Sequence, residues 1–324
     1  MLRKSTLFFG YSPRWCFEAS TSVTDLENRK DRAESVIQSA AGSWKDIIPL
    51  LHKSKTGGSD VSHTIFHIFP AGGNRLLSRC HFGPVSPWAL DRLLHYCEES
   101  RAHAAANFYY YLSSIPEAAV LRGHLFERQV LDHLCSIQTE RPFSTRGLTN
   151  SEEKEWIFRG PIQRIDLEDS TVSSKLAAAL GQKSLHFVPL FRSFPAVDSV
   201  LYDPKDENAA LTCIQITRNK KDHPIDVPGL QRIQSWLKLQ TPLEVLRPTK
   251  DKPWRFLFVV QSGMEAGFKL QKLKLKSKLG SDECHESEEW AAKVYQCVLG
   301  LEEETVFGKR SESASQPEKQ QVWY

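Results

Sequence analysis

The stretch SFPAVDSVLYDPKDENAALTCIQITRNKKDHP, residues 193–224, decides the fold. Two short apolar runs within it predict two strands, one around Asp198 and one carrying Gln215 and Thr217. The polar residues Asp203–Asn208 between the runs predict a turn. A carboxylate in an apolar strand is costly to bury without a partner, and a bound cation is one such partner. This hairpin is therefore the best candidate for a functional site.

The segments on either side of the hairpin predict alternating helices and strands. Before the hairpin we expect a polar, turn-rich stretch at Gln138–Glu155, a segment Trp156–Asp166 broken at Gly160-Pro161, and a short helix Ser173–Leu180. After the two strands of the hairpin we expect an amphipathic helix Val227–Leu239, an apolar strand Trp254–Gln261 and a closing helix Asp282–Leu301. This order predicts an α/β fold with a mixed sheet flanked by helices.

The region before the hairpin domain reads as mainly helical. Its expected elements are helices at Asp25–Ala41 and Ser43–Leu51, a strand at His63–Phe69, a long helix from Ser86-Pro87 towards Tyr111, and a helix from Pro116 to about Ile137. No GxxxxGK[ST] or GxGxxG motif is present to hold a nucleotide phosphate in the usual way. We therefore expect a mainly helical region at 1–115, an α/β domain at 116–305 and a disordered tail at 306–324.

Composition excludes several classes of protein. The seven cysteines are scattered and form no CxxC pair, which argues against a zinc ribbon or a disulfide framework and favours a reducing compartment. No stretch approaches the roughly 20 apolar residues of a membrane span, and the N-terminus is a poor signal peptide. The expectation is a soluble intracellular protein, nuclear or cytoplasmic, with no membrane partner; its oligomeric state is left open.

Several chemistry-bearing residues follow one another in a suggestive order. Glu127 lies on a predicted helix, Asp198 and Gln215 lie on successive strands, and Lys220, Lys221 and His223 come next. Carboxylate and amide oxygens are hard ligands that suit Mg²⁺, and a bound Mg²⁺ polarises a phosphodiester and lowers the pKa of its water.

This order resembles the PD-(D/E)XK restriction-endonuclease-like superfamily. In that superfamily a strand aspartate and an acidic or glutamine residue on the next strand hold Mg²⁺, a nearby lysine positions water, and a glutamate of the first helix often completes the site. The resemblance implies that Asp198, Gln215 and Glu127 bind the metal. It also implies that Lys220 or Lys221 assists catalysis and that DNA is the substrate.

A closer resemblance is to the C-terminal domain of Crinkler-type proteins and of the related retrotransposon hot spot proteins. The helix with Gly123, Phe126 and Glu127, the apolar segment with Asp198, and the run from Gln215 to Ile225 carry it. The segments GYSPRWCFEAS (residues 10–20) and HTIFHI (residues 63–68) look like the end of the ATPase module that precedes the nuclease domain there.

The chain departs from this pattern in three places. A neutral glutamine, Gln215, replaces the second acidic residue, and Thr217 occupies the position of the lysine two residues later. Without that lysine, Lys220 or Lys221 would have to reach back to the site. The phosphate-binding loop of the ATPase module is absent, which is what an N-terminally truncated or incomplete family member would lack.

Each candidate also has a structural interpretation. Asp198 can accept hydrogen bonds from backbone N–H groups at a strand end, and Gln215 can bond across the sheet. Glu127 can pair with Arg122 or Arg128 on its helix. The remaining candidates have structural interpretations too: strand packing for Thr217, and a solvated turn for Lys220 and Lys221. His223 could be a proton shuttle, and its structural interpretation is capping of the next helix or its loop.

A lysine-rich run follows the predicted strand Trp254–Gln261. Lys269, Lys272, Lys274, Lys276 and Lys278 interleave with leucines. Such a run can present charge to phosphates, or it can protect an edge strand against aggregation, and we favour the second interpretation. Two functional hypotheses remain: a Mg²⁺-dependent DNA endonuclease, and a degenerate nuclease fold that serves as an interaction or nucleic-acid-binding module of an effector or conflict-type protein.

Overall fold

The structure is a computed structural model and describes a defined part of the chain. The described residues are 9, 16, 19, 21–41, 65–70, 80–100, 104–113, 115, 118–160, 162–166, 169–188, 196–218, 223–275 and 288–308. The chain divides into two compact units, one formed by residues 1–125 with 307–324 and the other by Phe126–Val306. The division falls within a helix, ten residues beyond the boundary expected after residue 115.

The first unit is mainly helical. Its elements are α3 (Val23–Ala41), a hairpin of β1 (Phe66–Pro70) and β2 (Cys80–Pro84), α6 (Pro87–Ser100), α7 (Ala104–Leu112) and the start of α8 (Ala119–Ser136). The Ser86 hydroxyl accepts a hydrogen bond from the Ala89 N–H at 3.1 Å, so the predicted N-cap of α6 is confirmed. The helix expected to reach Tyr111 is instead two helices, α6 and α7. The helix predicted at Ser43–Leu51 lies outside the described residues.

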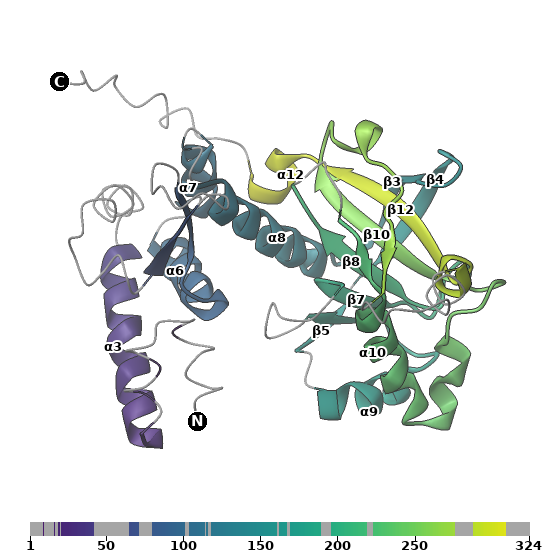
Figure 1. Cartoon of the computed structure of the whole chain (residues 1–324), viewed down its shortest axis with the longest axis horizontal. Helices are drawn as coiled ribbons and strands as arrows, with labels where there is room; N and C mark the ends of the chain where they lie inside the picture. Colours follow the sequence, from purple (N-terminus) through teal and green to yellow (C-terminus); the bar gives the residue numbers. More distant parts are fainter. Residues whose placement is uncertain are drawn as a thin grey trace. The chain divides into compact units, whose positions relative to one another are not determined.

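The second unit is built on an eight-stranded mixed sheet (Figure 1). Its strands are β3 (Glu140–Gly147), β4 (Glu153–Arg159), β5 (Gln163–Asp166), β6 (Leu185–Val188), β7 (Ser199–Tyr202), β8 (Thr212–Ile216), β10 (Trp254–Gln261) and β12 (Val294–Leu301). They lie in the order β4-β3-β12-β10-β8-β7-β6-β5. The pairs β8/β10, β10/β12 and β5/β6 are parallel, and the others are antiparallel.

The core centres on β10, whose bounds match the predicted strand Trp254–Gln261. Seven of its eight residues are buried because it pairs with a parallel strand on each side. The helices α9 (Asp169–Ala179) and α10 (Val227–Lys238) pack with this sheet into one apolar cluster that includes Val172, Leu230, Ile233 and Phe256. The Ser173 hydroxyl donates a hydrogen bond to the Trp236 carbonyl at 2.8 Å and ties the two helices together.

The predicted hairpin and the mixed α/β class are confirmed. The chain runs α9, β6, β7, β8, α10, β10, so three successive strands are followed by a helix and a parallel strand. The strands β7 and β8 are antiparallel, and the polar turn Asp203–Asn208 joins them, as the sequence predicts.

Two predicted segments are wrong. Residues 294–301, expected to end the closing helix, form β12, which lies between β10 and β3. The stretch Gln138–Glu155, expected to be a polar loop, contains all of β3 and the start of β4. Tertiary pairing decides both segments, because each gains a complete row of hydrogen bonds from a neighbouring strand.

Short elements complete the second unit. They are β9 (Ile225–Asp226), the 3₁₀ helices η2 (Thr241–Leu246) and η3 (Glu265–Gly267), β11 (Leu273–Lys274) and α12 (Glu303–Phe307), which ends at the unit boundary. β9 and β11 pair with each other in parallel. None of the helices in the described ranges combines the length and the apolar character needed to cross a membrane.

Candidate functional site

Asp198 lies directly before β7 and completes the pairing of β7 with β8. Its backbone N–H donates to the Ile214 carbonyl at 2.8 Å, and its Oδ2 accepts a hydrogen bond from the Ile216 N–H at 2.6 Å. The carboxylate therefore takes the place of a backbone carbonyl where the ladder ends. This is the contact that the structural interpretation of Asp198 expects, and it also fixes the direction of the carboxylate.

Glu127 reaches the same region from α8. Glu127 and Cys135 are eight residues apart and share one face of the helix. The Cys135 Sγ lies 3.1 Å from Nδ1 of the buried His186, and His186 Nε2 lies 2.8 Å from the Ser199 hydroxyl. This chain of contacts holds α8 against β6 and β7. Ser199 is the residue after Asp198, so the same helix face leads towards that carboxylate.

The electrostatics of Glu127 indicate that the two carboxyl groups are neighbours. Burial is the larger cause that raises the pKa of Glu127 well above its usual value, and repulsion by the Asp198 carboxylate raises this pKa further. A like charge nearby disfavours the ionised form of a carboxyl group. The structure thus places the first two predicted site residues within electrostatic range of each other, although they are about 70 positions apart in the sequence.

Gln215 comes from β8, on the strand beside Asp198. Ser199 on β7 is paired with Ile214 on β8. Because the two strands are antiparallel, Asp198, which precedes Ser199, faces Gln215, which follows Ile214. The Oε1 atom of Gln215 is buried and accepts no hydrogen bond within the described part of the chain. An unsatisfied buried polar atom typically costs about 1–3 kcal/mol, so the expected bond across the sheet does not explain this side chain. A ligand that the amide oxygen can bind would explain it.

Thr217 and His223 form a pair at the end of β8. The Thr217 Oγ1 lies 2.7 Å from the His223 Nε2, and the backbone N–H of His223 donates to the Gln271 Oε1 at 2.7 Å. Thr217 is therefore more than the strand-packing residue that the sequence suggested. The residue directly before α10 is Asp226, so His223 does not cap that helix.

The two predicted catalytic lysines, Lys220 and Lys221, lie in the segment 219–222, outside the described residues. Sequence reasoning underrated His223 and missed Gln271. The HP dipeptide drew attention to His223, but no feature of the sequence near Gln271 marks it as a partner of a residue 48 positions earlier.

The donor set fits a hard divalent cation. Glu127 and Asp198 supply carboxylate oxygens, and Gln215 supplies an amide oxygen that has no hydrogen-bond partner in the described ranges. Throughout the residues that the structure describes, no group of three or more His, Cys, Asp or Glu side chains could hold a metal ion. A cation here would therefore have two carboxylates and one amide as protein ligands. Mg²⁺ commonly binds through one or two carboxylates and keeps several waters.

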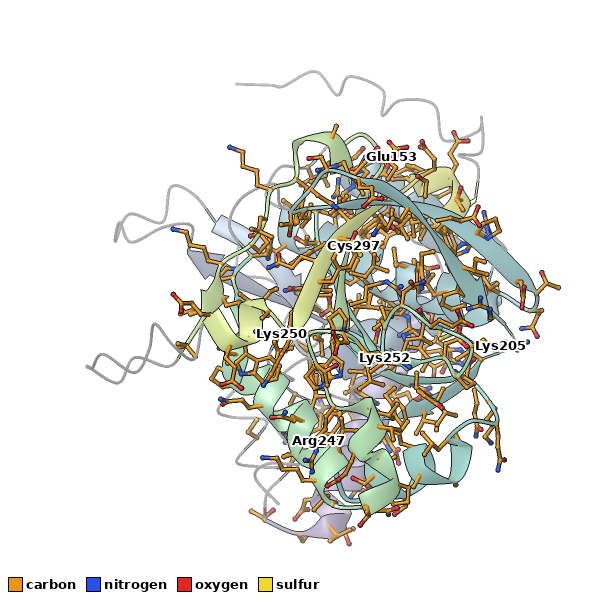
Figure 2. All side chains as sticks on the ribbon, turned by 90° about the vertical axis from the view of Figure 1, so that its right-hand side faces the viewer. Glu153, Lys205, Arg247, Lys250, Lys252 and Cys297 are labelled. Carbon is orange, nitrogen blue, oxygen red and sulfur yellow. The ribbon has the colours of Figure 1, made fainter. Side chains whose placement is uncertain are left out.

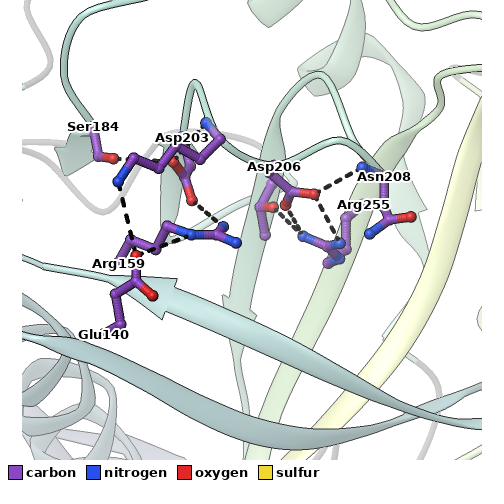
Figure 3. Close-up of polar contacts among 9 residues, drawn as sticks. Glu140, Arg159, Ser184, Asp203, Asp206, Asn208 and Arg255 are labelled. Carbon is purple, nitrogen blue, oxygen red and sulfur yellow. Dashed lines mark hydrogen bonds and ion pairs between the residues drawn. The ribbon is translucent and has the colours of Figure 1, made fainter.

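A separate polar pocket of about 280 Å³ lies at the opposite ends of β8 and β10. Its cationic residues are all paired: Arg255 with Asp206, Arg159 with Asp203 at 2.9 Å, and Lys205 with Glu140 at 3.8 Å. Figure 3 shows the two arginine pairs side by side below the turn that joins β7 and β8. Because their charges compensate each other, these residues serve the fold around the turn and do not belong to the candidate site.

Comparisons of the chain with protein-family models, with curated proteins and with solved structures find no match.

Proposed function

We propose that this protein is a metal-dependent endonuclease that hydrolyses DNA phosphodiesters at the site formed by Glu127, Asp198 and Gln215. The observation that carries the proposal is the buried Oε1 of Gln215, which has no hydrogen-bond partner among the described residues; Asp198, whose charge raises the pKa of Glu127, precedes the strand paired with that of Gln215. A divalent cation would relieve both costs at once. The order of helix, three strands, helix and strand, with Asp198 and Gln215 on adjacent strands, agrees with the restriction-endonuclease-like resemblance.

Mg²⁺ bound by Glu127, Asp198 and Gln215 would supply charge to the scissile phosphate and lower the pKa of an attacking water. The protein prepares for that cation in two ways. The Ile216 N–H holds the Asp198 carboxylate in one direction. The raised pKa of Glu127 favours a proton on this carboxyl when no cation is bound, which reduces its repulsion with Asp198.

The Thr217–His223 pair takes the place that lysine holds in the resembling proteins. A hydroxyl bonded to an imidazole can orient a water molecule or accept a proton, which are roles that a nearby lysine would otherwise fill. The sequence between Thr217 and His223 also contains Lys220 and Lys221, which remain candidates for contacts with phosphate.

A second candidate function is binding of nucleic acid or a protein without turnover. It is favoured by the neutral Gln215 and by Thr217, because both replace charged groups of the resembling site. An interaction module of this kind would keep the fold and lose the chemistry.

Hydrolysis of a labelled DNA duplex under single-turnover conditions separates the two functions. The endonuclease proposal predicts cleavage by the wild-type chain in Mg²⁺ or Mn²⁺ and none in EDTA. His223→Gln should lower the cleavage rate constant and leave the duplex affinity unchanged, because the imidazole acts on the reaction and not on the DNA backbone. A duplex that is bound but never cleaved, with either metal, would favour the second function.

A further inference from the structure

The lysine segment, residues 269–274, follows β10 and η3 in the chain and ends in β11, which pairs with β9. Because β8 and β10 are parallel, the chain that follows each of them emerges at the same edge of the sheet. There β11 pairs with β9, with Leu273 opposite Ile225, and the Ile225 N–H donates to the Lys272 carbonyl at 2.9 Å. The lysine segment thus runs alongside the residues that directly follow His223.

Buried side chains hold this segment in position. The Gln271 N–H donates to the Gln296 Oε1 at 3.0 Å, and the Gln296 Nε2 donates to the Gln271 carbonyl at 2.9 Å. The ring of Phe268 is buried, and its centroid lies 5.0 Å from that of Phe258 on β10. Arg146 on β3 donates to the Phe268 carbonyl at 2.8 Å. Strands β3, β10 and β12 therefore all anchor the segment.

The same glutamine joins the segment to the candidate site. The Gln271 Oε1 accepts the His223 N–H at 2.7 Å, and the His223 ring contacts Thr217. Thr217 lies two residues after Gln215, directly after the strand that carries this proposed metal ligand. The contacts from Gln271 to Thr217 therefore fix the lysines relative to the metal ligands.

The segment presents only positive charge to solvent. Lys269, Lys272 and Lys274 are exposed and make no ion pair with any residue that the structure describes. Within the β9–β11 pairing, the carboxylate residue Asp226 lies opposite Lys274. Protection of an edge strand explains only Lys274, because Lys269 and Lys272 precede the two-residue strand β11.

We propose that the lysine segment binds the phosphate backbone of double-stranded DNA and presents that DNA to the site of Asp198 and Gln215. The inference rests on the proposed nuclease function for its choice of partner. Three exposed lysines on a segment that is held in place can each contact a phosphate, and each phosphate contact releases about one condensed counterion. The affinity should therefore depend on salt through these three residues.

The test is the affinity of the full chain for a fluorescently labelled DNA duplex, measured by anisotropy over a range of salt concentrations in EDTA. The test variant is Lys269→Gln/Lys272→Gln/Lys274→Gln. The control variant is Lys205→Gln/Lys250→Gln/Lys252→Gln, which removes the same charge from exposed lysines labelled in Figure 2. Lys252 is two residues before β10, whose eight residues span about 23 Å, so these lysines lie at the far end of the strands from the lysine segment.

The proposal predicts that the test variant binds at least roughly tenfold more weakly and that its slope of log affinity against log salt falls by about 2–3. The control variant should change both quantities much less, and both variants should keep the wild-type melting temperature. Equal weakening in the two variants, or an unchanged salt slope in the test variant, would overturn the proposal. Because EDTA prevents turnover, this result is independent of nuclease activity: a chain that never cleaves DNA can still pass or fail it.

Discussion

The Asp198 carboxylate accepts a hydrogen bond from the Ile216 N–H at 2.6 Å, where β7 and β8 separate. The side chain of Asp198 thereby completes the pairing of the two strands, at the end of β8 that carries Gln215, whose buried oxygen lacks a hydrogen-bond partner in the described ranges. A structural role and a ligand role are compatible here, because the hydrogen bond occupies one lone pair of Oδ2 and carboxylate oxygens offer about four.

Substitutions of Asp198 should separate these two roles. Asp198→Asn keeps an acceptor oxygen for Ile216 but removes the charge, so it should abolish metal-dependent cleavage and change stability little. Asp198→Ala loses the hydrogen bond as well, and should also lower the free energy of unfolding by about 1.5–3 kcal/mol. Cleavage assays and denaturant unfolding of both variants check this. Undiminished cleavage by Asp198→Asn would exclude Asp198 as a metal ligand.

Glu127 should make the metal-free protein less stable as the pH rises. The unfolded chain releases the Glu127 proton near pH ~4.3, whereas the folded protein, with its raised pKa, holds the proton to a higher pH. Between these two values the folded state binds more protons than the unfolded state, so stability falls with increasing pH. Each unit of pKa difference is worth about 1.4 kcal/mol.

The measurement is the melting temperature of wild type and Glu127→Gln from acid to mildly alkaline pH in EDTA. The variant should be the more stable of the two at alkaline pH. The control is Glu289→Gln, because the hydrogen bond from Lys293 lowers the pKa of this exposed carboxyl. Glu289→Gln weakens this favourable interaction, so this variant should be slightly less stable than wild type at neutral pH. The change in stability thus has the opposite sign to that expected for Glu127→Gln. Coincident pH profiles for wild type and Glu127→Gln would show that the surroundings do not disfavour the ionised form of Glu127.

Substitutions of Gln215 should change the stability of the metal-free protein and its binding of Mg²⁺ in opposite directions. Gln215→Leu removes the buried oxygen that has no described partner, and should leave stability unchanged or raise it by about 1 kcal/mol while abolishing stabilisation by Mg²⁺. Gln215→Glu adds a third carboxylate, so it should destabilise the metal-free protein and enlarge the Mg²⁺-dependent rise in melting temperature. Thermal unfolding with and without Mg²⁺ measures both. A loss of stability in Gln215→Leu would instead indicate that the amide makes a structural hydrogen bond.

The ion pair of Arg255 with Asp206 should matter for folding alone. Both side chains of the pair shown in Figure 3 are about nine-tenths buried, and Arg255 also donates to the Thr212 hydroxyl at 3.1 Å. Asp206→Ala leaves a buried unpaired guanidinium and should cost about 3–5 kcal/mol. Lys205→Ala breaks an exposed pair and should cost less than about 1 kcal/mol. Neither change should alter the cleavage rate per folded molecule; a direct effect of Asp206→Ala on that rate would assign the pocket to the site.

The strands and helices of the second unit that follow a clear hydrophobic period could be predicted from the sequence. Trp254–Gln261 is apolar at six of its eight residues and has the expected bounds, and Val227–Lys238 has the expected amphipathic pattern. The hairpin of β7 and β8 could be predicted because a polar turn separates two apolar runs.

Residues 294–301 could not be predicted because their pattern fits two structures. Trp290, Val294, Cys297, Val298 and Leu301 have helical spacing, yet the segment is a strand because β10 offers it eight parallel partners. The polar, turn-rich composition of Gln138–Glu155 predicts a loop, yet residues 140–147 form β3. β12 pairs with β3 only at Arg146 and Gly147. The earlier residues of β3 pair with β4 alone, so Pro142 is tolerated on the side of β3 that has no neighbouring strand there.

The candidate site was predictable as a set of residue types but not as a set of contacts. Asp198 and Gln215 stand out because they interrupt apolar strands. The proximity of Glu127 to Asp198, and the contacts of Gln271 with His223, depend on tertiary packing across 48 or more residues, which no local pattern encodes.

The measurement that tests the central claim most directly is cleavage of supercoiled plasmid by purified protein in Mg²⁺ or Mn²⁺, with an EDTA control and with Asp198→Asn alongside. The account predicts nicked and linear products from the wild-type protein, and none with EDTA or with the variant. Intact plasmid after incubation with folded wild-type protein in both metals would contradict the endonuclease assignment, as would cleavage that persists in Asp198→Asn.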